Sequence, residues 1–334
     1  MPSPVRITDV SPRDGLQNEP GVIPTAEKVR LVELLCAAGV DEVEVTSFVS
    51  PKWVPQLADG AGVLAAVRRP SEKGLAPVFS ALVPNELGMQ GVLNVNRNAH
   101  ARLVSKVAVF TAASETFSKK NTNASIAETI ERFRPVVQTA LREGLVVRGY
   151  VSCVIACPFE GPIEPARVVG VAESLMALGV HEIDLGDTIG AGTAESVARL
   201  LKGYASEFPI REAKTLCTLH LHDTFGRAAE CVKAALGLGV RSFDGAVGGL
   251  GGCPYASTPQ RRAPGNISTE LLVRTIQDAG YETSVDLGKL GEAAVFAREI
   301  VGEARERAGA GDTRGTPGAS QSLSPGVGDG GGGG

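Results

Sequence analysis

The sequence predicts an α/β fold, a (β/α)8 TIM barrel, followed by one extra helix. Three observations support this fold. Short β-type runs alternate with helix-type segments, eight such repeats fit between residues 5 and 280, and polar residues follow the strands again and again. Strands that alternate with helices form parallel sheets covered by helices. The alternative with the same alternation is an open, doubly wound sheet.

The predicted strands are short runs rich in valine and other β-branched residues. The spacing between consecutive runs leaves room for a crossover helix, which parallel strands require. The strands cover residues 5–11, 42–48, 76–83, 106–113, 146–155, 182–188, 216–223 and 242–249. In such barrels the chemistry lies at the carboxyl ends of the strands, so candidate site residues are sought there.

The predicted helices have apolar residues at helical spacing, as with Leu31, Leu34 and Leu35 in the first. Several end in Ala-Gly or Leu-Gly, a common helix stop. They cover residues 25–39, 124–144, 165–179, 194–208, 227–239 and 268–280. We expect residues 286–306 to form the extra helix, closing one end of the barrel.

The chain divides into one large domain and a tail. Its 334 residues suit a single α/β barrel. From Ala308 onward glycine, serine and proline dominate, and few residues could pack against a core. We therefore predict a barrel domain over residues 1–307 and a disordered tail over residues 308–334.

The composition excludes several classes of partner and compartment. A net charge of −4 with 4% aromatic residues argues against nucleic-acid binding, and no apolar run approaches the ~18 residues of a membrane span. The six cysteines lie mostly in apolar runs without a signal peptide, which predicts free thiols. With neither a transit peptide nor a peroxisomal signal, the cytoplasm is the default location. The mitochondrial matrix fits if the chain is a mature form.

Two histidines on the seventh strand are the sharpest local feature. His220 and His222 are two of only four histidines, and side chains two positions apart on a strand share a face. They could bind one metal ion, or they could be interior histidines with satisfied hydrogen bonds. Asp14, at the end of the first strand, is the carboxylate best placed to complete the site. Nitrogen and oxygen ligands favour Mg²⁺ or Mn²⁺, with Zn²⁺ or Co²⁺ as alternatives.

Other residues at the strand ends allow two interpretations. Cys253 lies in a glycine-rich loop and could be a proton donor, a nucleophile or a tolerated small residue. Asn266 could be the N-cap of the last barrel helix. Asp187 could be a turn residue. A zinc site at Cys153 and Cys157 is disfavoured because no second cysteine pair accompanies them.

Six strings, taken in order, resemble the hydroxymethylglutaryl-CoA lyase family. They are PRDGLQNE (12–19), VTSFVSPKWVPQLADG (45–60), RGYVSCV (148–154), LGDTIGAGT (185–193), HLHDTFGRA (220–228) and GLGGCPYA (249–256). The resemblance covers roughly residues 4–300, and the second and sixth strings are highly specific. Members are metal-dependent TIM-barrel lyases, related to isopropylmalate and homocitrate synthases.

The resemblance implies an activity. The substrate would be an acyl-CoA, 3-hydroxy-3-methylglutaryl-CoA, cleaved to acetyl-CoA and acetoacetate in leucine degradation and ketone-body formation, by a homodimer. The implied metal ligands are Asp14, His220, His222 and Asn266. The implied catalytic residues are Arg13 for the enolate-like oxygen, Cys253 as catalytic thiol, and Glu44 and Asp187 as acids near the substrate. The implied supporting positions for substrate are Gln17, Ser47 and Arg148.

The chemistry of a retro-Claisen cleavage suits these residues. The C3 hydroxyl must lose a proton to His220, Asp14 or Asp187, while a metal lowers its pKa. Arg13 would stabilise charge on the thioester oxygen, and Cys253 would protonate the acetyl-CoA enolate.

Two departures from the family pattern leave alternatives open. STPQRRAP (257–264) lengthens the loop before Asn266, and Asp184 stands where a small polar residue is expected. A related acyl-CoA condensing or aldol enzyme and a non-catalytic barrel paralogue are therefore the alternatives.

Overall fold

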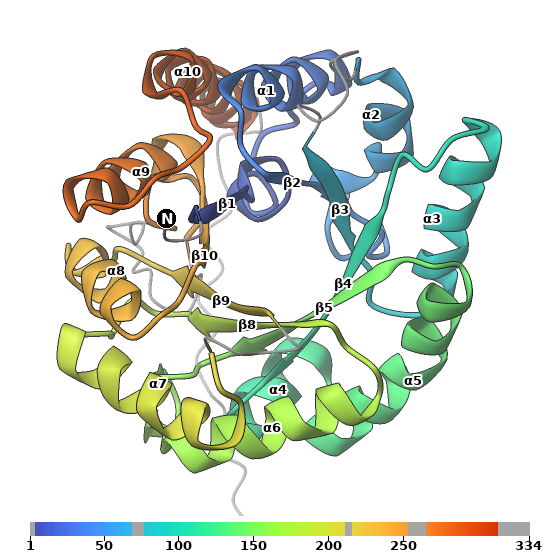
Figure 1. Cartoon of the computed structure of the whole chain (residues 1–334). Helices are drawn as coiled ribbons and strands as arrows, with labels where there is room; N and C mark the ends of the chain where they lie inside the picture. The colour runs from blue at the N-terminus through green and yellow to red at the C-terminus, as the bar shows by residue number, and fades with distance from the viewer. Residues whose placement is uncertain (1–3, 69–76, 211–215, 253–264, 313–334) are drawn as a thin grey trace, which may run out of the picture.

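A computed structural model shows a closed barrel of eight parallel strands (Figure 1). It describes residues 4–68, 77–210, 216–252 and 265–312. The barrel strands are β1 (Arg6–Asp9), β2 (Glu42–Ser47), β3 (Val78–Leu82), β4 (Lys106–Ala112), β5 (Val146–Ser152), β8 (Glu182–Asp187), β9 (Leu216–Leu221) and β10 (Ser242–Gly245). Every one lies within a predicted range. Because β1 pairs in parallel with both β2 and β10, the sheet closes, and the open-sheet alternative is wrong.

The helices form a ring around this barrel (Figure 1). They are α1 (Thr25–Ala38), α2 (Gly60–Ala66), α3 (Glu86–Asn98), α4 (Glu115–Thr122), α5 (Ile126–Arg142), α6 (Pro165–Ala177), α7 (Ala194–Glu207), α8 (Ala228–Gly237) and α9 (Thr269–Asp278). Local signals explain several ends: Ser125 and Glu128 form a capping box, and Gly39 ends α1 at φ 79°. Helices α2, α3 and α4 were not among the predicted ones.

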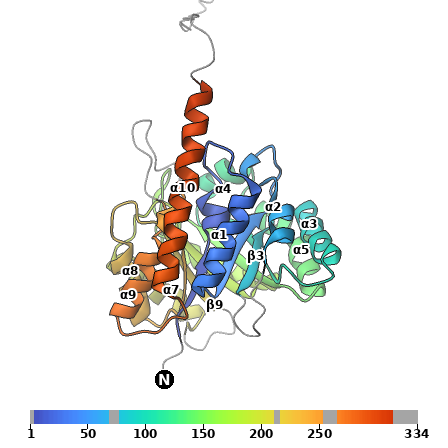
Figure 2. The same cartoon turned by 90° about the horizontal axis from the view of Figure 1, so that it is seen from above.

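The extra helix α10 (Leu287–Asp312) lies in the helical ring between α9 and α1 (Figures 1 and 2). It does not cover one end of the barrel, so that part of the prediction is wrong. It contacts α1 and α9 and buries small side chains such as Ala297 and Ala304. The helix ends at Asp312, five residues beyond the predicted domain end at 307. The rest of the predicted tail lies outside the described residues.

Charged side chains fill the amino end of the barrel interior. Lys106 Nζ lies 2.5 Å from Glu42 Oε2 and 2.6 Å from Glu182 Oε2, and Arg148 Nη2 lies 2.5 Å from Glu182 Oε1. All four side chains are at most 4% exposed. We call these four residues the base network. Each cation in it faces carboxylates, so the barrel interior is held by ion pairs as well as by apolar packing.

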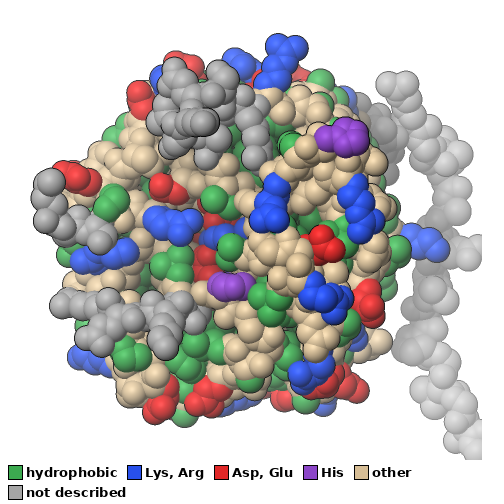
Figure 3. Space-filling view, turned by 45° about the vertical axis from the view of Figure 1, so that its right-hand side comes forward, with side chains coloured by type: hydrophobic (Ala, Val, Ile, Leu, Met, Phe, Trp, Pro, Cys, Tyr) green, Lys and Arg blue, Asp and Glu red, His purple; other side chains and the backbone are tan. Residues whose placement is uncertain are grey.

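Several smaller features bear on the sequence predictions. Five of the six cysteines are free and buried, and Cys253 lies outside the described residues. Among the described helices, none has the length and apolar character needed to cross a bilayer. On the face seen in Figure 3, basic and acidic side chains are interspersed. A two-stranded hairpin, β6 (Ala156–Cys157) with β7 (Gly161–Pro162), follows β5 and was not predicted.

Candidate active site

A single π-helical turn follows β1 and carries the Arg–Asp pair. This turn, η1 (Ser11–Gly15), is closed by the Gly15 N–H, which donates to the Val10 carbonyl at 3.1 Å. The Pro12 ring at the start of the turn suits a position whose N–H needs no partner. Single π-helical turns are frequent at functional sites.

Asp14, His220 and His222 come together at the barrel mouth. One ligand-type atom from each lies within 4.8 Å of the others. The two histidines are 8% and 7% exposed, and their ring centroids are 5.4 Å apart. The predicted shared face of the i, i+2 pair is thus confirmed.

Asn266 joins this group despite the longer loop before it. Its backbone pairs with His222, and its side-chain Nδ2 donates to Asp14 Oδ2 at 2.8 Å and to the Leu250 carbonyl at 3.1 Å. The N-cap of α9 is Ser268, whose hydroxyl accepts from the Leu271 N–H, so the cap interpretation of Asn266 is wrong. We call Asp14, His220, His222 and Asn266 the mouth cluster.

Two polar atoms of the mouth cluster are buried without a hydrogen-bond partner among the described residues: His222 Nδ1 and Asn266 Oδ1. Leaving such atoms unpaired is costly, so a bound cation would resolve the deficit. Burial raises the pKa of the Asp14 carboxyl, but Arg13 and the histidines outweigh it and lower that pKa to about 2. Burial, with a contribution from His220, lowers the pKa of His222 to about 4, which keeps its ring neutral at pH 7. The residues fit a divalent cation with nitrogen and oxygen ligands.

Arg13 lies beside the mouth cluster, held by two carboxylates. Its Nε donates to Glu44 Oε2 at 2.5 Å and its Nη1 to Asp14 Oδ1 at 2.6 Å. Its guanidinium carbon is 5.4 Å from the centre of the Tyr150 ring. Gln17 Nε2 donates to Asp14 Oδ1 at 3.0 Å. Glu44 and Gln17 therefore orient Arg13 and Asp14.

Two residues of this region carried no predicted role. Tyr150 Oη lies 3.2 Å from Glu44 Oε2 and 3.4 Å from Asp244 Oδ2. Asp244 in turn lies 3.3 Å from His220 Nδ1. The alternation of strand residues could have indicated Tyr150, because it shares a face with Arg148 two positions earlier. Asp244 meets His220 across two strands, a contact that no pattern along the chain reveals.

Three predicted site residues are not members of the mouth cluster. Both carboxylate oxygens of Asp187 accept backbone N–H groups, from Ala191 at 3.0 Å and Gly192 at 2.7 Å, which shapes the loop after β8. Ser47 Oγ accepts from the Val49 N–H at 3.1 Å. Arg148 is 1% exposed within the barrel interior. Their direct roles toward substrate stay predictions, as does that of Cys253, which lies outside the described residues.

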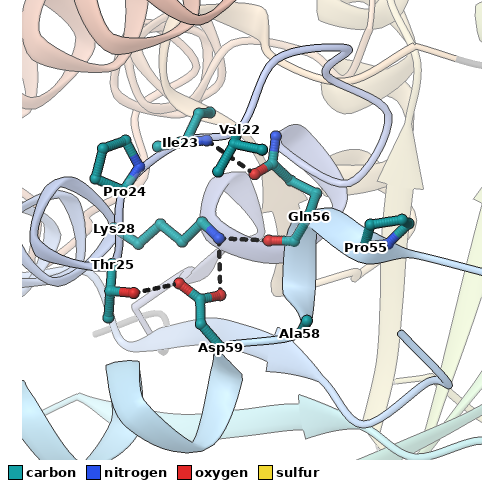
Figure 4. Close-up of a pocket in the computed structure, with 9 residues that line it drawn as sticks. All are labelled: Val22, Ile23, Pro24, Thr25, Lys28, Pro55, Gln56, Ala58 and Asp59. Atoms are coloured by element: carbon teal, nitrogen blue, oxygen red, sulfur yellow. Dashed lines mark hydrogen bonds and ion pairs between the residues drawn. The ribbon is translucent and has the colours of Figure 1, made fainter. Parts of the chain in front are cut away.

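A separate cavity of about 270 Å³ lies between the start of α1 and the loop after β2 (Figure 4). Lys28 Nζ, inside it, contacts Asp59 Oδ1 at 2.7 Å and also the Gln56 carbonyl. Thr25 donates to the same carboxylate at 2.7 Å. These groups satisfy one another's hydrogen bonds, so they connect the start of α1 to the loop after β2.

Comparisons with known proteins agree with the geometry. The HMGL-like family model matches residues 4–296. A Danio rerio protein named cytoplasmic 3-hydroxy-3-methylglutaryl-CoA lyase is 45% identical over 296 residues, covering 89% of this chain and 83% of its own. A Pseudomonas aeruginosa protein named 3-hydroxy-3-isohexenylglutaryl-CoA/hydroxy-methylglutaryl-CoA lyase is 43% identical, covering 91% and 95%.

A solved structure gives the same result for the fold. The HMG-CoA lyase of Brucella melitensis superposes with a TM-score of 0.80 at 43% identity, over 90% of this chain and 99% of that one. The family match spans the whole barrel, including every residue of the mouth cluster. The chain belongs to the HMGL-like family, which groups it with the hydroxymethylglutaryl-CoA lyases.

Proposed function

We propose that the protein is a divalent-metal-dependent carbon–carbon lyase that cleaves 3-hydroxy-3-methylglutaryl-CoA to acetyl-CoA and acetoacetate. The observation that carries this proposal is the mouth cluster, with Arg13 beside it, in a chain 45% identical to a named lyase. An active site of this reaction needs a cation and a fixed positive side chain near one oxygen-rich substrate.

The mouth cluster would hold the cation, through Asp14, His220, His222 and the Asn266 amide oxygen. When bound, the ion would lower the pKa of the substrate hydroxyl and orient the substrate. Mg²⁺ or Mn²⁺ suits a ligand set without thiolate. Gln17 and Arg13 keep the Asp14 carboxylate in one orientation, so the site is arranged before the ion arrives.

Arg13 would stabilise the charge that develops on the thioester oxygen as the bond breaks. Its Nε and Nη1 are used by Glu44 and Asp14, and in the described part of the chain Nη2 is the nitrogen left for a substrate oxygen. Glu44 is fully buried, which fixes the guanidinium against movement. The loss of the C3 hydroxyl proton falls to His220, Asp14 or Asp187.

Cys253 would donate the proton that completes acetyl-CoA, a role that rests on the resemblance of the GLGGCPYA loop. Cys253→Ser should therefore lower kcat by about 10²–10⁴-fold, the usual contribution of general acid catalysis. Mn²⁺ affinity should not change, because Cys253 is not a ligand. Wild-type kcat in the serine variant would remove the thiol from the mechanism.

One assay tests the activity. Purified protein is incubated with hydroxymethylglutaryl-CoA and Mg²⁺ or Mn²⁺, and acetoacetate is followed, with an EDTA-treated sample as control. Absence of product with both metals would refute the proposal. Binding of the substrate without product would favour the non-catalytic paralogue, and condensation of acetyl-CoA with a 2-oxo acid would favour the condensing enzyme.

A second substrate belongs in the same assay, because the Pseudomonas relative is also named for 3-hydroxy-3-isohexenylglutaryl-CoA. The ratio of kcat/KM for the two acyl-CoA thioesters would show how much room the pocket leaves at C3. Relatives include cytoplasmic and mitochondrial forms, and we predict the cytoplasm for this chain. The predicted homodimer is testable by sedimentation velocity.

A further inference from the structure

Beneath the mouth cluster, His220 meets a carboxylate that no role has yet been given. Its Nδ1 lies 3.3 Å from Asp244 Oδ2, and Asp244 is 1% exposed. The two residues are register partners on neighbouring strands β9 and β10, so the backbone ladder itself fixes their separation. A contact set by paired strands is more rigid than one set by loops.

Asp244 is itself held in place by two side chains of β5. Arg148 Nη1 donates to both of its oxygens, at 3.0 and 3.2 Å, and Tyr150 Oη lies 3.4 Å from Oδ2. Both Asp244 oxygens thus accept from a guanidinium, as an ionised carboxylate does. The group facing His220 Nδ1 is therefore an anion with a fixed orientation, which accepts a hydrogen bond and cannot donate one.

We propose that Asp244 is a positioning residue that fixes His220 as the neutral tautomer protonated at Nδ1, which leaves Nε2 free to bind the metal. This inference rests on the proposed metal site. Histidine ligands generally donate their second ring N–H to a carboxylate or carbonyl, which sets the tautomer and the ring orientation. Here Asp244 supplies that acceptor. The Tyr150 ring packs edge-on against His220, with centroids 6.1 Å apart, which limits rotation of the His220 ring.

A second metal ion is the competing explanation for this arrangement. Asp184, His220 and Asp244 also bring ligand-type atoms within 4.8 Å of one another. However, Arg148 Nη1 lies 3.0 Å from Asp244 and 3.4 Å from Asp184, so a guanidinium already occupies the cationic position between the two carboxylates. The structure thus favours a hydrogen-bonded support for His220 over a second ion.

The inference narrows the choice of base in the proposed reaction. With Nδ1 donating to Asp244 and Nε2 binding the ion, His220 has no free nitrogen to accept the substrate proton. The roles of ligand and base, both predicted for His220, cannot then be combined. The base would be Asp14 or Asp187.

Direct metal titration of three proteins tests the proposal. Asp244→Asn keeps the size of the side chain but replaces the anion with an amide that can also donate. Thr8→Val is the matched control. Thr8 Oγ1 accepts from Arg148 Nη2 at 3.1 Å, and Thr8 is the register partner of Asp244 on β1, a backbone pairing that valine keeps. Mn²⁺ affinity should fall about 10–100-fold in Asp244→Asn and stay at the wild-type value in Thr8→Val. Equal affinity in wild type and Asp244→Asn, or an equal loss in the control, would overturn the proposal.

The tautomer is read separately, in metal-free wild-type protein with ¹⁵N-labelled histidine. The imidazole shifts of His220, assigned with a His220→Gln variant, should show Nδ1 protonated and Nε2 bare. The opposite tautomer overturns the inference even if Asp244→Asn does not fold. Failure of the wild type to bind Mn²⁺ would count against the proposed function, while this measurement would still decide the role of Asp244.

Discussion

The two ends of the barrel interior use charged residues in opposite ways. In the base network, cations and carboxylates lie within 2.5–2.6 Å of one another around Lys106. In the mouth cluster, a carboxylate, two imidazole rings and an amide converge, and two buried atoms find no partner among the described residues. A buried charge needs an opposite charge close by, and the two ends meet that need differently. At the amino end the chain supplies cations for all the carboxylates. At the mouth Arg13 pairs with Asp14, but His222 Nδ1 and Asn266 Oδ1 are left for the proposed metal ion.

The amino end of the barrel contributes stability to the fold, whereas the mouth gives up some stability. Buried ion pairs cost desolvation, but breaking one by removing a single partner costs more. The base network therefore locks the amino end of the barrel. The mouth cluster keeps unsatisfied atoms at the carboxyl end, as binding sites do. Three substitutions test this difference.

The largest effect is expected from Lys106→Met at the amino end. It would leave Glu42 with Arg148 and the more distant Arg6, and Glu182 with Arg148 and the Thr218 hydroxyl. The expected cost is about 3–5 kcal/mol in unfolding free energy, measured by urea titration. Mn²⁺ affinity should not change, because the mouth is untouched. The double variant Lys106→Met/Glu42→Gln removes one stranded charge and should regain part of the loss. A loss below about 1 kcal/mol would mean that the network contributes no more than a surface pair.

His222→Ala should have the opposite profile. Mn²⁺ affinity should fall more than about 100-fold, beyond the loss typical of a supporting residue, and metal-free stability should fall far less than in Lys106→Met. Mn²⁺ at about 100 times its dissociation constant should stabilise the wild type by about 2.7 kcal/mol and the variant hardly at all. His181→Ala is the control, since His181 accepts the Val147 N–H away from the mouth cluster. Unchanged affinity in His222→Ala would contradict the ligand assignment.

The same comparison shows what the sequence could predict. Strand alternation and spacing predicted all eight barrel strands, and the i, i+2 rule placed His220 and His222 on one face. These are local patterns with a fixed period. Helix α3 escaped because its two glycines and three asparagines are poor helix formers, and the burial of Met89, Val92 and Leu93 stabilises it instead.

The role of Asp244 could not be predicted, because its contacts join residues of different strands. Asp244 meets Arg148, 96 positions earlier, and His220, 24 positions earlier, only once the sheet has closed. The π-helical turn at Arg13 and Asp14 was likewise unreadable, since residues 11–15 have no period of their own. Asn266 shows the reverse: it was the weakest of the four predicted ligands because of the longer loop before it, yet strand-like pairing with His222 keeps it at the mouth.

The smallest effect is expected at the outer support of the mouth, where α10 reaches the loop that follows Asp14. Arg305 Nε and Nη2 donate to the two oxygens of Glu19 at 2.8 and 3.0 Å, and the Glu19 side chain is fully buried. A Cβ on Gly21 would lie 1.8 Å from the Ala304 carbonyl, so helix and loop are in direct backbone contact. Helix α10 thus holds the loop at Glu19, five residues after Asp14 of the mouth cluster.

Arg305→Gln should cost about 1 kcal/mol in unfolding free energy, because the pair is half exposed on the arginine side. Arg307→Gln is the matched control: it removes an exposed pair with Glu303 on the same helix and a 4.0 Å pair with Glu27 of α1, and should be nearly neutral. If the helix also orients the loop, Arg305→Gln should weaken Mn²⁺ binding slightly where Arg307→Gln does not. Equal Mn²⁺ affinity in both variants would mean that α10 stabilises the fold but does not orient the loop. The order at the mouth would then come from inside the barrel, through Gln17, Glu44 and Asp244, and not from the helical ring outside it.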